Sequence, residues 1–142
     1  MTVRRMTSLL LAALVAACDG AIHVRGRVYA RSAGDTLAPS VALVDRSGID
    51  TAGLAPLSGA SVTLFQRLED TASATPESLL WVRRDTTRAD GSFNLYDIGP
   101  PSAYTAALRV SRAGHRSTTV AFRHRSSREI HRAVVVLTPL PK

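Results

Sequence analysis

Hydrophobic and polar residues alternate with a period of two along much of this chain. From His23 to Arg31 the even positions hold small or apolar residues, and the odd positions hold histidine, arginine and tyrosine. Such alternation is typical of a β-strand with one buried face and one solvated face. No segment after Cys18 predicts a helix. The same period, or a short apolar run between turn signals, predicts further strands at residues 60–68, 79–87, 92–95, 104–110, 117–122 and 132–138.

The stretch from Asp85 to Val110 predicts two consecutive strand connections. Its Asp90-Gly91 pair predicts a type I′ hairpin turn, because glycine reaches a positive φ without steric cost. The Gly99-Pro100-Pro101 corner ends the next strand, because proline donates no hydrogen bond to a sheet ladder. A third strand begins at Tyr104, so we expect a hairpin followed by a corner.

Two other segments indicate their own positions in the fold. Residues 134–137 read Val-Val-Val-Leu, which predicts a strand in the middle of a sheet. Residues 32–58 form an insertion rich in Gly, Pro, Ser and Asp, and a structureless loop of that length is uncommon in a compact domain. Within the insertion, residues 41–44 predict a short edge strand. The remainder is expected to be either a surface excursion or a flap that faces a ligand.

These elements predict an all-β protein, a Greek-key β-sandwich of about seven strands preceded by a cleaved N-terminal signal helix. The inner faces of two such sheets interdigitate across about 10 Å. The predicted division is a signal peptide at 1–17, a lipidated cysteine and tether at 18–22, the sandwich at 23–138 and a tail at 139–142.

The N-terminus has the layout of an export signal. Arg4 and Arg5 precede an apolar run at 9–15, which is shorter than the about 20 residues that cross a bilayer. An ordinary secretory signal or a core helix would share these features. The sequence Val15-Ala16-Ala17-Cys18, however, resembles the lipobox of bacterial lipoproteins. The resemblance implies that Cys18 becomes the first residue and carries a thioether-linked diacylglycerol, with acyl chains such as palmitate.

Cysteine usage agrees with this resemblance. Cys18 is the only cysteine, so no intrachain disulfide can form in an oxidising compartment. A thioether accounts for a lone cysteine in an exported chain better than a free thiol does. Buried acyl chains contribute about 0.8 kcal/mol per CH₂, and two or more chains hold a protein on a membrane. We therefore expect a protein of the bacterial cell envelope, anchored by lipid to a membrane and facing the periplasm or the cell surface.

Charge is distributed unevenly along the chain, whose formal net charge is +7. Between Cys18 and Pro100 acidic residues outnumber basic ones, whereas from Pro101 onward Glu129 is the only acidic residue. The basic end predicts an anionic lipid, a polysaccharide or an envelope protein as partner, unless it is a solvated hairpin that protects a sheet edge. Nucleic acid is not expected, because no recognition motif occurs. The candidate anion-binding residues are Arg109, Arg112, Arg116, Arg123, Arg125, Arg128 and Arg132.

Sequence motifs for catalysis are missing. Neither a nucleophile elbow nor a phosphate-binding loop occurs, so we expect no cofactor and no enzymatic activity. Trp81 is expected in the core; if exposed, Trp81 or Tyr29 would mark a carbohydrate-binding platform. The histidines lack helical zinc-site spacing, and we expect no metal site and a surface position for all four: His23, His115, His124 and His131.

Four short motifs follow one another in a fixed order: Gly26-Arg27-Val28, then Pro-Leu-Ser-Gly-Ala-Ser-Val-Thr-Leu at 56–64, Thr-Arg-Ala-Asp-Gly-Ser-Phe at 87–93, and Gly-Pro-Pro-Ser-Ala-Tyr at 99–104. In this order they resemble the carboxypeptidase regulatory-like domain, a prealbumin-type sandwich also compared with transthyretin. The sequence departs from that pattern at Gly114-His115, where the family has an aromatic residue after the glycine, and at the long insertion.

The resemblance implies a module that binds, packs or spaces other components and does not catalyse. Transthyretin-like hydrolases end in Tyr-Arg-Gly-Ser, whereas this chain ends Leu-Thr-Pro-Leu-Pro-Lys. The expected function is therefore that of a non-enzymatic, membrane-anchored envelope lipoprotein with a binding or spacer role. The alternative is a carbohydrate-binding module at the cell surface.

Overall fold

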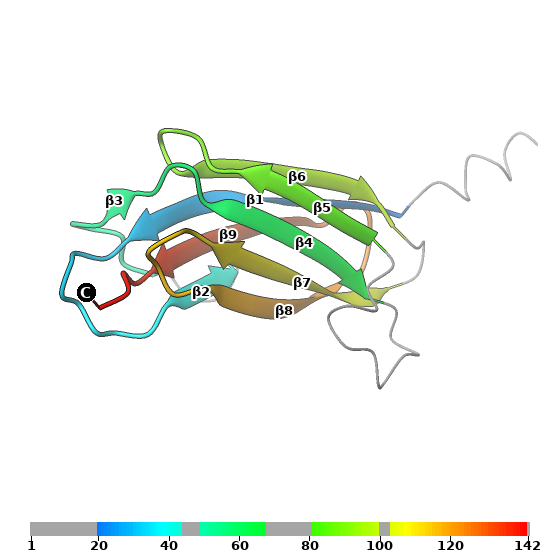
Figure 1. Cartoon of the computed structure of the whole chain (residues 1–142). Coiled ribbons are helices and arrows are strands. Elements are labelled where there is room, and N and C mark those ends of the chain that lie inside the picture. Colours follow the sequence, from blue (N-terminus) through cyan, green and yellow to red (C-terminus); the bar gives the residue numbers. More distant parts are fainter. Residues whose placement is uncertain (1–19, 44–48, 68–80, 100–102, 142) are drawn as a thin grey trace, which may run out of the picture.

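In the computed structural model, two β-sheets pack face to face as a sandwich (Figure 1). The structure describes residues 20–43, 49–67, 81–99 and 103–141, so the predictions for the signal peptide and Cys18 lie outside it. No helix of this described part is long and apolar enough to cross a membrane. The predicted all-β sandwich is confirmed, with nine strands in the described residues: β1 (Ala21–Ala30), β2 (Ser40–Leu43), β3 (Ala55–Pro56), β4 (Ser61–Arg67), β5 (Trp81–Thr86), β6 (Ser92–Ile98), β7 (Tyr104–Ser111), β8 (Thr118–His124) and β9 (Ile130–Leu137).

The first sheet, called sheet A below, contains five strands, with β9 lying between β2 and β1. The far edge of β1 is shared by β6, which pairs along residues 21–27, and by β3, which pairs with Tyr29 and Ala30. β1 and β9 run parallel, and β2 pairs with β9 in the antiparallel sense. The prediction that residues 134–137 form a central strand is confirmed, as is the short edge strand within the insertion.

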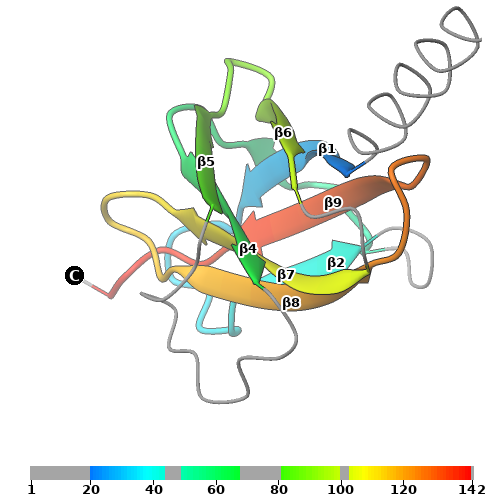
Figure 2. The same cartoon turned by 90° about the vertical axis from the view of Figure 1, so that its right-hand side faces the viewer.

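The second sheet, sheet B, contains four antiparallel strands in the order β5-β4-β7-β8. Its in-sheet neighbours β4 and β5, and β7 and β8, are consecutive in the chain. The chain passes from one sheet to the other at three later connections: β5 to β6, β6 to β7, and β8 to β9. These crossings place residues from both sheets at each end of the sandwich (Figure 2).

Apolar side chains on the facing sides of both sheets form one core. Their positions follow the alternation in the sequence, because successive strand residues point to opposite faces. Burying a side chain of this size contributes roughly 1.5–3 kcal/mol. The fully buried members on the strands are Ile22, Val24, Val28, Val62, Leu64, Tyr104, Ala106, Leu108, Val110, Val135 and Leu137.

The prediction of a type I′ hairpin turn at Asp90-Gly91 was wrong. Gly91 has a φ of 75°, but no described non-glycine residue has a positive φ, so Asp90 lacks the conformation of a type I′ turn. The Arg88 and Ser92 backbones close a three-residue turn that ends in the left-handed glycine. The strands on either side of this turn lie in different sheets: β5, before it, pairs with β4 of sheet B, and β6, after it, pairs with β1 of sheet A. The turn is therefore a crossing between sheets.

The solvated hairpin expected at the basic end would have its tip at residues 123–129, but the strands on either side of this segment lie in different sheets. β8 pairs with β7 in sheet B, whereas β9 pairs with β1 and β2 in sheet A. Within the connection the Glu129 amide donates to the Ser126 carbonyl (3.0 Å), and the Arg125 amide donates to the Glu129 carboxylate (3.0 Å). This crossing brings the end of β8 close to the start of β9, across the two sheets.

The packed domain extends by a few residues beyond the predicted bounds of 23 and 138. β1 begins at Ala21, and Ile22, expected in the tether, is fully buried in the core. At the other end Pro139 forms a bridge with His115, and the Leu140 amide donates to the Gly114 carbonyl (2.8 Å). Both segments therefore belong to the packed domain.

Candidate functional site: a basic groove on sheet A

A shallow groove of about 600 Å³ lies on the outer face of sheet A, over β1, β6 and β9. Its basic lining comes from Arg25 and Arg27 of β1, Arg88 of the β5–β6 turn and Arg132 of β9. The alternation of β1 places Arg25 and Arg27 outside, because Val24 and Val28 are buried in the core. We call the hollow lined by these four arginines the basic groove.

Arg25 and Arg132 are cross-strand neighbours in this groove. Arg25 pairs in register with Arg132 of β9 on one side and with Asn94 of β6 on the other. Neighbouring strands lie about 4.8 Å apart, so the two arginine side chains leave the sheet beside each other. Like charges placed opposite each other destabilise a sheet. The row Asn94–Arg25–Arg132 therefore places two like charges side by side on an exposed face, where one anion could contact both.

Carboxylates compensate only part of the groove's charge. Arg27 lies 3.7 Å from the Asp90 carboxylate, and both side chains are more than half exposed. Hydrogen bonds from Ser92, more than the charge of Arg27, hold the pKa of Asp90 below its ordinary value. Within the described part of the chain, no carboxylate lies within ion-pair distance of the other three groove arginines, Arg25, Arg88 and Arg132.

His23 and Asn94 form the polar wall of the groove. The His23 Nε2 atom hydrogen-bonds the Asn94 Oδ1 atom (2.5 Å), and the Tyr96 ring packs edge-on against the imidazole. The backbone N–H of Asn94 donates to the Asp85 carboxylate (2.8 Å). Tyr29 lines the groove near the other end of β1 and is half-buried. The bonded pair of His23 and Asn94 therefore presents a polar surface beside the arginines.

The structure does not bring the seven predicted anion-binding arginines together. Arg132 alone lines the groove, while Arg109 and Arg123 lie on the outer face of sheet B. The remaining four occupy the two connections at opposite ends of the sandwich, with Arg112 and Arg116 between β7 and β8, and Arg125 and Arg128 between β8 and β9 (Figure 2). The sequence-based prediction missed Arg25, Arg27 and Arg88, although the alternation of β1 places the first two on a solvated face.

The surface prediction was wrong for two of the four histidines. His124 and His131 expose only 2% and 7% of their surface, whereas His23 and His115 are partly exposed. Burial lowers the pKa of His124, which keeps the imidazole neutral at physiological pH. A neutral imidazole that finds a hydrogen-bond partner can be buried, and spacing in the sequence does not reveal that partner.

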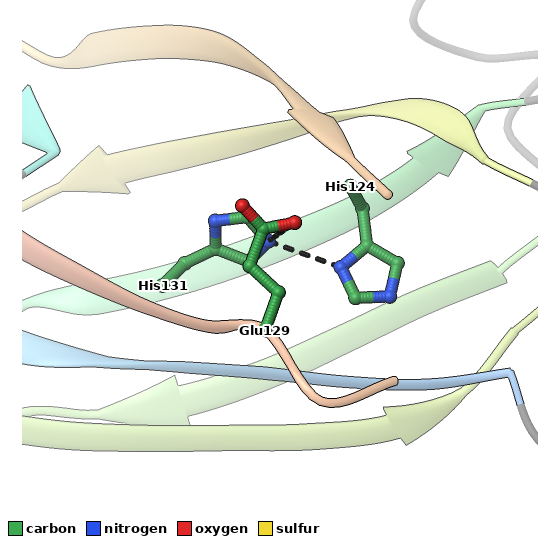
Figure 3. A group of neighbouring side chains, drawn as sticks. All are labelled: His124, Glu129 and His131. Carbon is green, nitrogen blue, oxygen red and sulfur yellow. Dashed lines mark hydrogen bonds and ion pairs between the residues drawn. The ribbon is translucent and has the colours of Figure 1, made fainter. Parts of the chain in front are cut away.

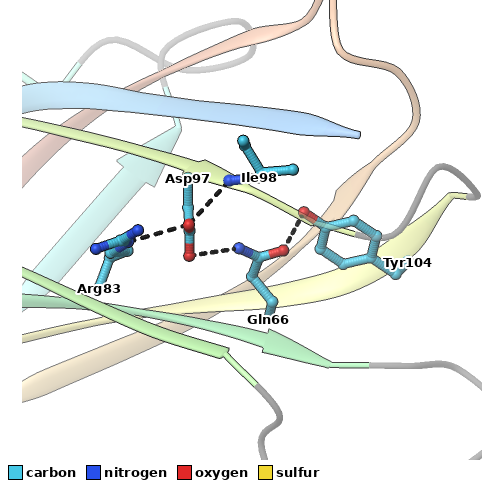
Figure 4. A network of polar contacts seen from close by, with 5 residues as sticks. All are labelled: Gln66, Arg83, Asp97, Ile98 and Tyr104. Atoms are coloured by element: carbon cyan, nitrogen blue, oxygen red, sulfur yellow. Dashed lines mark hydrogen bonds and ion pairs between the residues drawn. The ribbon is translucent and has the colours of Figure 1, made fainter. Parts of the chain in front are cut away.

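A second buried polar group crosses between the sheets (Figure 4). The Tyr104 hydroxyl donates to Gln66 Oε1 (2.7 Å), and Gln66 Nε2 donates to Asp97 Oδ2 (3.0 Å). Arg83 lies 3.0 Å from the other oxygen of Asp97. Burial, with a smaller contribution from the charge of Asp97, raises the pKa of Tyr104, so its hydroxyl stays protonated. Each member is satisfied by another, as in a structural network.

A second hollow, of about 850 Å³, lies between residues 33–36 and the C-terminal segment 139–141. Arg116 is its only basic lining residue, and the acidic Asp35 pairs with Arg31 (3.7 Å). Glycine, proline and alanine supply much of the remaining wall. It therefore offers fewer groups that could orient a ligand than the basic groove does. The prediction for the Trp81 side chain lies outside the described structure.

Comparison with solved structures supports the fold. The shaft pilin SpaA of Lactobacillus rhamnosus GG (D295N mutant) matches 84% of this chain with a TM-score of 0.53 at 12% identity, and the chain spans 51% of that structure. The 3-chlorocatechol 1,2-dioxygenase of Rhodococcus opacus 1CP matches 84% of the chain with a TM-score of 0.49 at 10% identity, and the chain spans 60% of its length. Neither a family model nor a curated protein matches the sequence. The likeness to SpaA is one of fold alone and agrees with the β-sandwich described above.

Proposed function

We propose that this chain is a lipid-anchored, non-enzymatic binding module of the bacterial cell envelope, which holds an acidic polysaccharide in the basic groove. The lipobox-like sequence that ends at Cys18 and the lack of any other cysteine support the anchor. The ordered motifs that resemble the carboxypeptidase regulatory-like domain support a module without chemistry of its own. The arginine lining of the groove supports an acidic ligand.

The observation that carries this proposal is the position of Arg25 beside Arg132, with no carboxylate of the described structure paired to either. A guanidinium presents its donors in a planar fork that matches a carboxylate or phosphate with two parallel hydrogen bonds. A uronic acid carboxylate placed between the two forks would turn a repulsive pair into two charge-assisted contacts. The neighbouring Asn94 amide and Tyr29 ring suit the hydroxyl groups and the apolar face of a sugar.

The direction of the groove favours a polymer over lipid headgroups. Its lining follows β1 from His23 to Tyr29, along the length of the sandwich. The proposed anchor precedes the start of β1, so the membrane would lie near that end of the sandwich. A groove along the side wall is open to an extended chain, whereas headgroups would reach the end of the sandwich first.

The interior supports a non-enzymatic role. Among the described residues that are not exposed, the only side-chain polar atom buried without a hydrogen-bond partner is Arg31 Nε. The Tyr104 hydroxyl, which is protonated and engaged with Gln66, is not an activated nucleophile. Buried polar groups that satisfy one another, as these do, stabilise a unique packing.

Binding of polygalacturonate, a carboxylated polysaccharide, tests the groove. We expect the wild-type protein to bind with an affinity that falls as salt rises, and the triple variant R25S/R88S/R132S to bind at least tenfold more weakly. The matched control R109S/R112S/R116S removes the same charge elsewhere and should bind like wild type. Equal losses in both variants, or no binding by the wild type, would contradict the proposal. Equal binding to neutral pullulan would favour a carbohydrate-binding module that reads the sugar rather than the charge.

Cell fractionation tests the anchor separately. We expect wild-type protein in the membrane fraction and the Cys18→Ser variant to be unlipidated and released from it. Two or more acyl chains bind a membrane far more firmly than this domain would alone. Recovery of Cys18→Ser in the membrane fraction at the wild-type level would count against lipidation and would leave the groove experiment unaffected.

A further inference from the structure

We propose that His124, Glu129 and His131 form a transition-metal site, suited to Zn²⁺, that ties the two sheets together at one end of the sandwich (Figure 3). His124 ends β8 of sheet B, and His131 lies at the start of β9 of sheet A. Glu129 stands in the connection between them. The site is separate from the basic groove and from the function proposed for that groove.

The three side chains already converge on one point. One ligand atom from each residue can be chosen so that all three lie within 4.8 Å of one another. The His124 Nδ1 and His131 Nε2 atoms are 3.0 Å apart, and His131 Nε2 is 3.9 Å from Glu129 Oε2. Donors bound to one tetrahedral zinc at 2.0–2.1 Å lie about 3.3 Å apart. To admit the ion, the His124–His131 distance would open by about 0.3 Å and the His131–Glu129 distance would close by about 0.6 Å, while the His124–Glu129 distance, at most 4.8 Å, would close by up to about 1.5 Å.

Neighbouring backbone groups orient two of the ligands. A backbone hydrogen bond with Ala21 engages the His124 imidazole, whose Nδ1 atom faces His131. The Arg125 amide donates to the same carboxylate oxygen of Glu129 that faces His131. Outer contacts of this kind, to a carbonyl or an amide, fix ring orientation and carboxylate position at metal centres. The donor set of two histidines and one glutamate is one that zinc accepts.

The rings are also held by packing. Phe122 lies against the His131 ring with centroids 4.5 Å apart, and Tyr104 lies against the His124 ring at 5.2 Å. Both imidazoles are more than nine-tenths buried, whereas the Glu129 side chain is about one-third exposed. A metal ion could therefore enter on the exposed side, past Glu129, and would meet two imidazoles that packing already holds in place.

A simple hydrogen bond between the two imidazoles is the competing interpretation. It accounts for the 3.0 Å contact, and the bond from the Arg125 amide accounts for the position of the carboxylate, but neither requires a Glu129 oxygen to lie 3.9 Å from the same His131 nitrogen. The nearby cations Arg125 and Arg128 are exposed, so water and salt screen their repulsion of a bound ion. Because the ligands come from β8, β9 and their connection, a bound ion would restrain the crossing between the sheets. Binding to the folded state alone raises stability by mass action.

Zinc titration of the purified full chain in detergent, followed by calorimetry, tests the site. We expect one Zn²⁺ per chain and a zinc-dependent rise in the melting temperature. Glu129→Gln and His131→Gln should each weaken zinc binding at least tenfold, whereas His115→Gln, which changes a histidine outside the cluster, should leave it unchanged. Co²⁺ in place of Zn²⁺ should give the intense visible absorption of a tetrahedral site.

Circular dichroism establishes that each variant is folded before titration. Should the buried substitution His131→Gln unfold the protein, the partly exposed Glu129→Gln decides the question. The proposal is overturned if the wild type binds no zinc, if Glu129→Gln binds it as tightly as the wild type does, or if His115→Gln alone abolishes binding. A weak, octahedral-type Co²⁺ spectrum would equally contradict it.

Discussion

Gln66 of sheet B donates its side-chain amide to the Asp97 carboxylate of sheet A across 3.0 Å, within the interior of the sandwich (Figure 4). Asp97 is 5% exposed and Gln66 is 2% exposed, so this bond joins the two sheets away from water. The Tyr104 hydroxyl completes the group on the far side of Gln66. The polar group specifies how the sheets face each other, because a shifted packing would leave its members unsatisfied.

Asp97→Ala is expected to lower the free energy of unfolding by about 2–3 kcal/mol, because it leaves the buried Gln66 amide without an acceptor. Arg83→Ala should cost less, about 1 kcal/mol, because the Gln66 side chain and the Ile98 backbone still donate to the buried Asp97 carboxylate and water screens the exposed Arg83 side chain. Urea denaturation of both variants measures the difference. Equal losses would mean that the ion pair, and not the buried amide, holds the sheets.

The turn that carries the chain between sheets gives a second prediction. A Cβ atom at Gly91 would lie 2.4 Å from the Val28 carbonyl oxygen, in addition to the strain of a φ of 75°. Gly114 has a similar φ of 77° but has no atom within 4 Å of such a Cβ. Gly114→Ala should therefore cost about 1 kcal/mol from backbone strain.

Gly91→Ala should cost clearly more than Gly114→Ala, because the Val28 strand must also move. Thermal unfolding of the two variants, compared with the wild type, isolates the contribution of the close approach. Equal shifts in melting temperature would show that the turn tolerates displacement from β1 and that the crossing is not fixed by this contact.

The buried His124 predicts a dependence of stability on pH. Burial lowers its pKa in the folded state below the ordinary value of 6.5, so the unfolded chain takes up a proton at higher pH than the folded chain does. This contribution to stability is complete above about pH 6.5 and is lost as the pH falls toward the folded pKa. With a chelator present, the wild type should lose stability between pH 7 and pH 5, and His124→Gln should lose less. A control, His115→Gln, should retain the full wild-type loss.

Much of the strand content could be predicted from the sequence, because the alternation of small and polar residues reports which face of each strand is buried. The central place of β9 followed from its valine run, and the edge strand β2 followed from Val41–Leu43 between turn signals. These predictions succeed because the apolar face that the alternation marks on each strand is the face that packs into the core.

Strand partners and buried polar contacts could not be predicted in this way. Alternation around Asp90-Gly91 is the same whether the next strand stays in the sheet or crosses to the other one. The parallel pairing of β1 with β9, which makes Arg25 and Arg132 neighbours, joins segments over 100 residues apart. His124 and His131 likewise find each other only after the crossing between sheets is formed.

The proposed role depends most on where an acidic ligand lies. Backbone amide shifts of the isotope-labelled protein, recorded while oligogalacturonate is added, locate it directly. We predict that the largest changes occur at Arg25, Asn94 and Arg132 on the outer face of sheet A. Changes confined to Arg109 and Arg123 on sheet B, or no saturable change at any residue, would contradict the account.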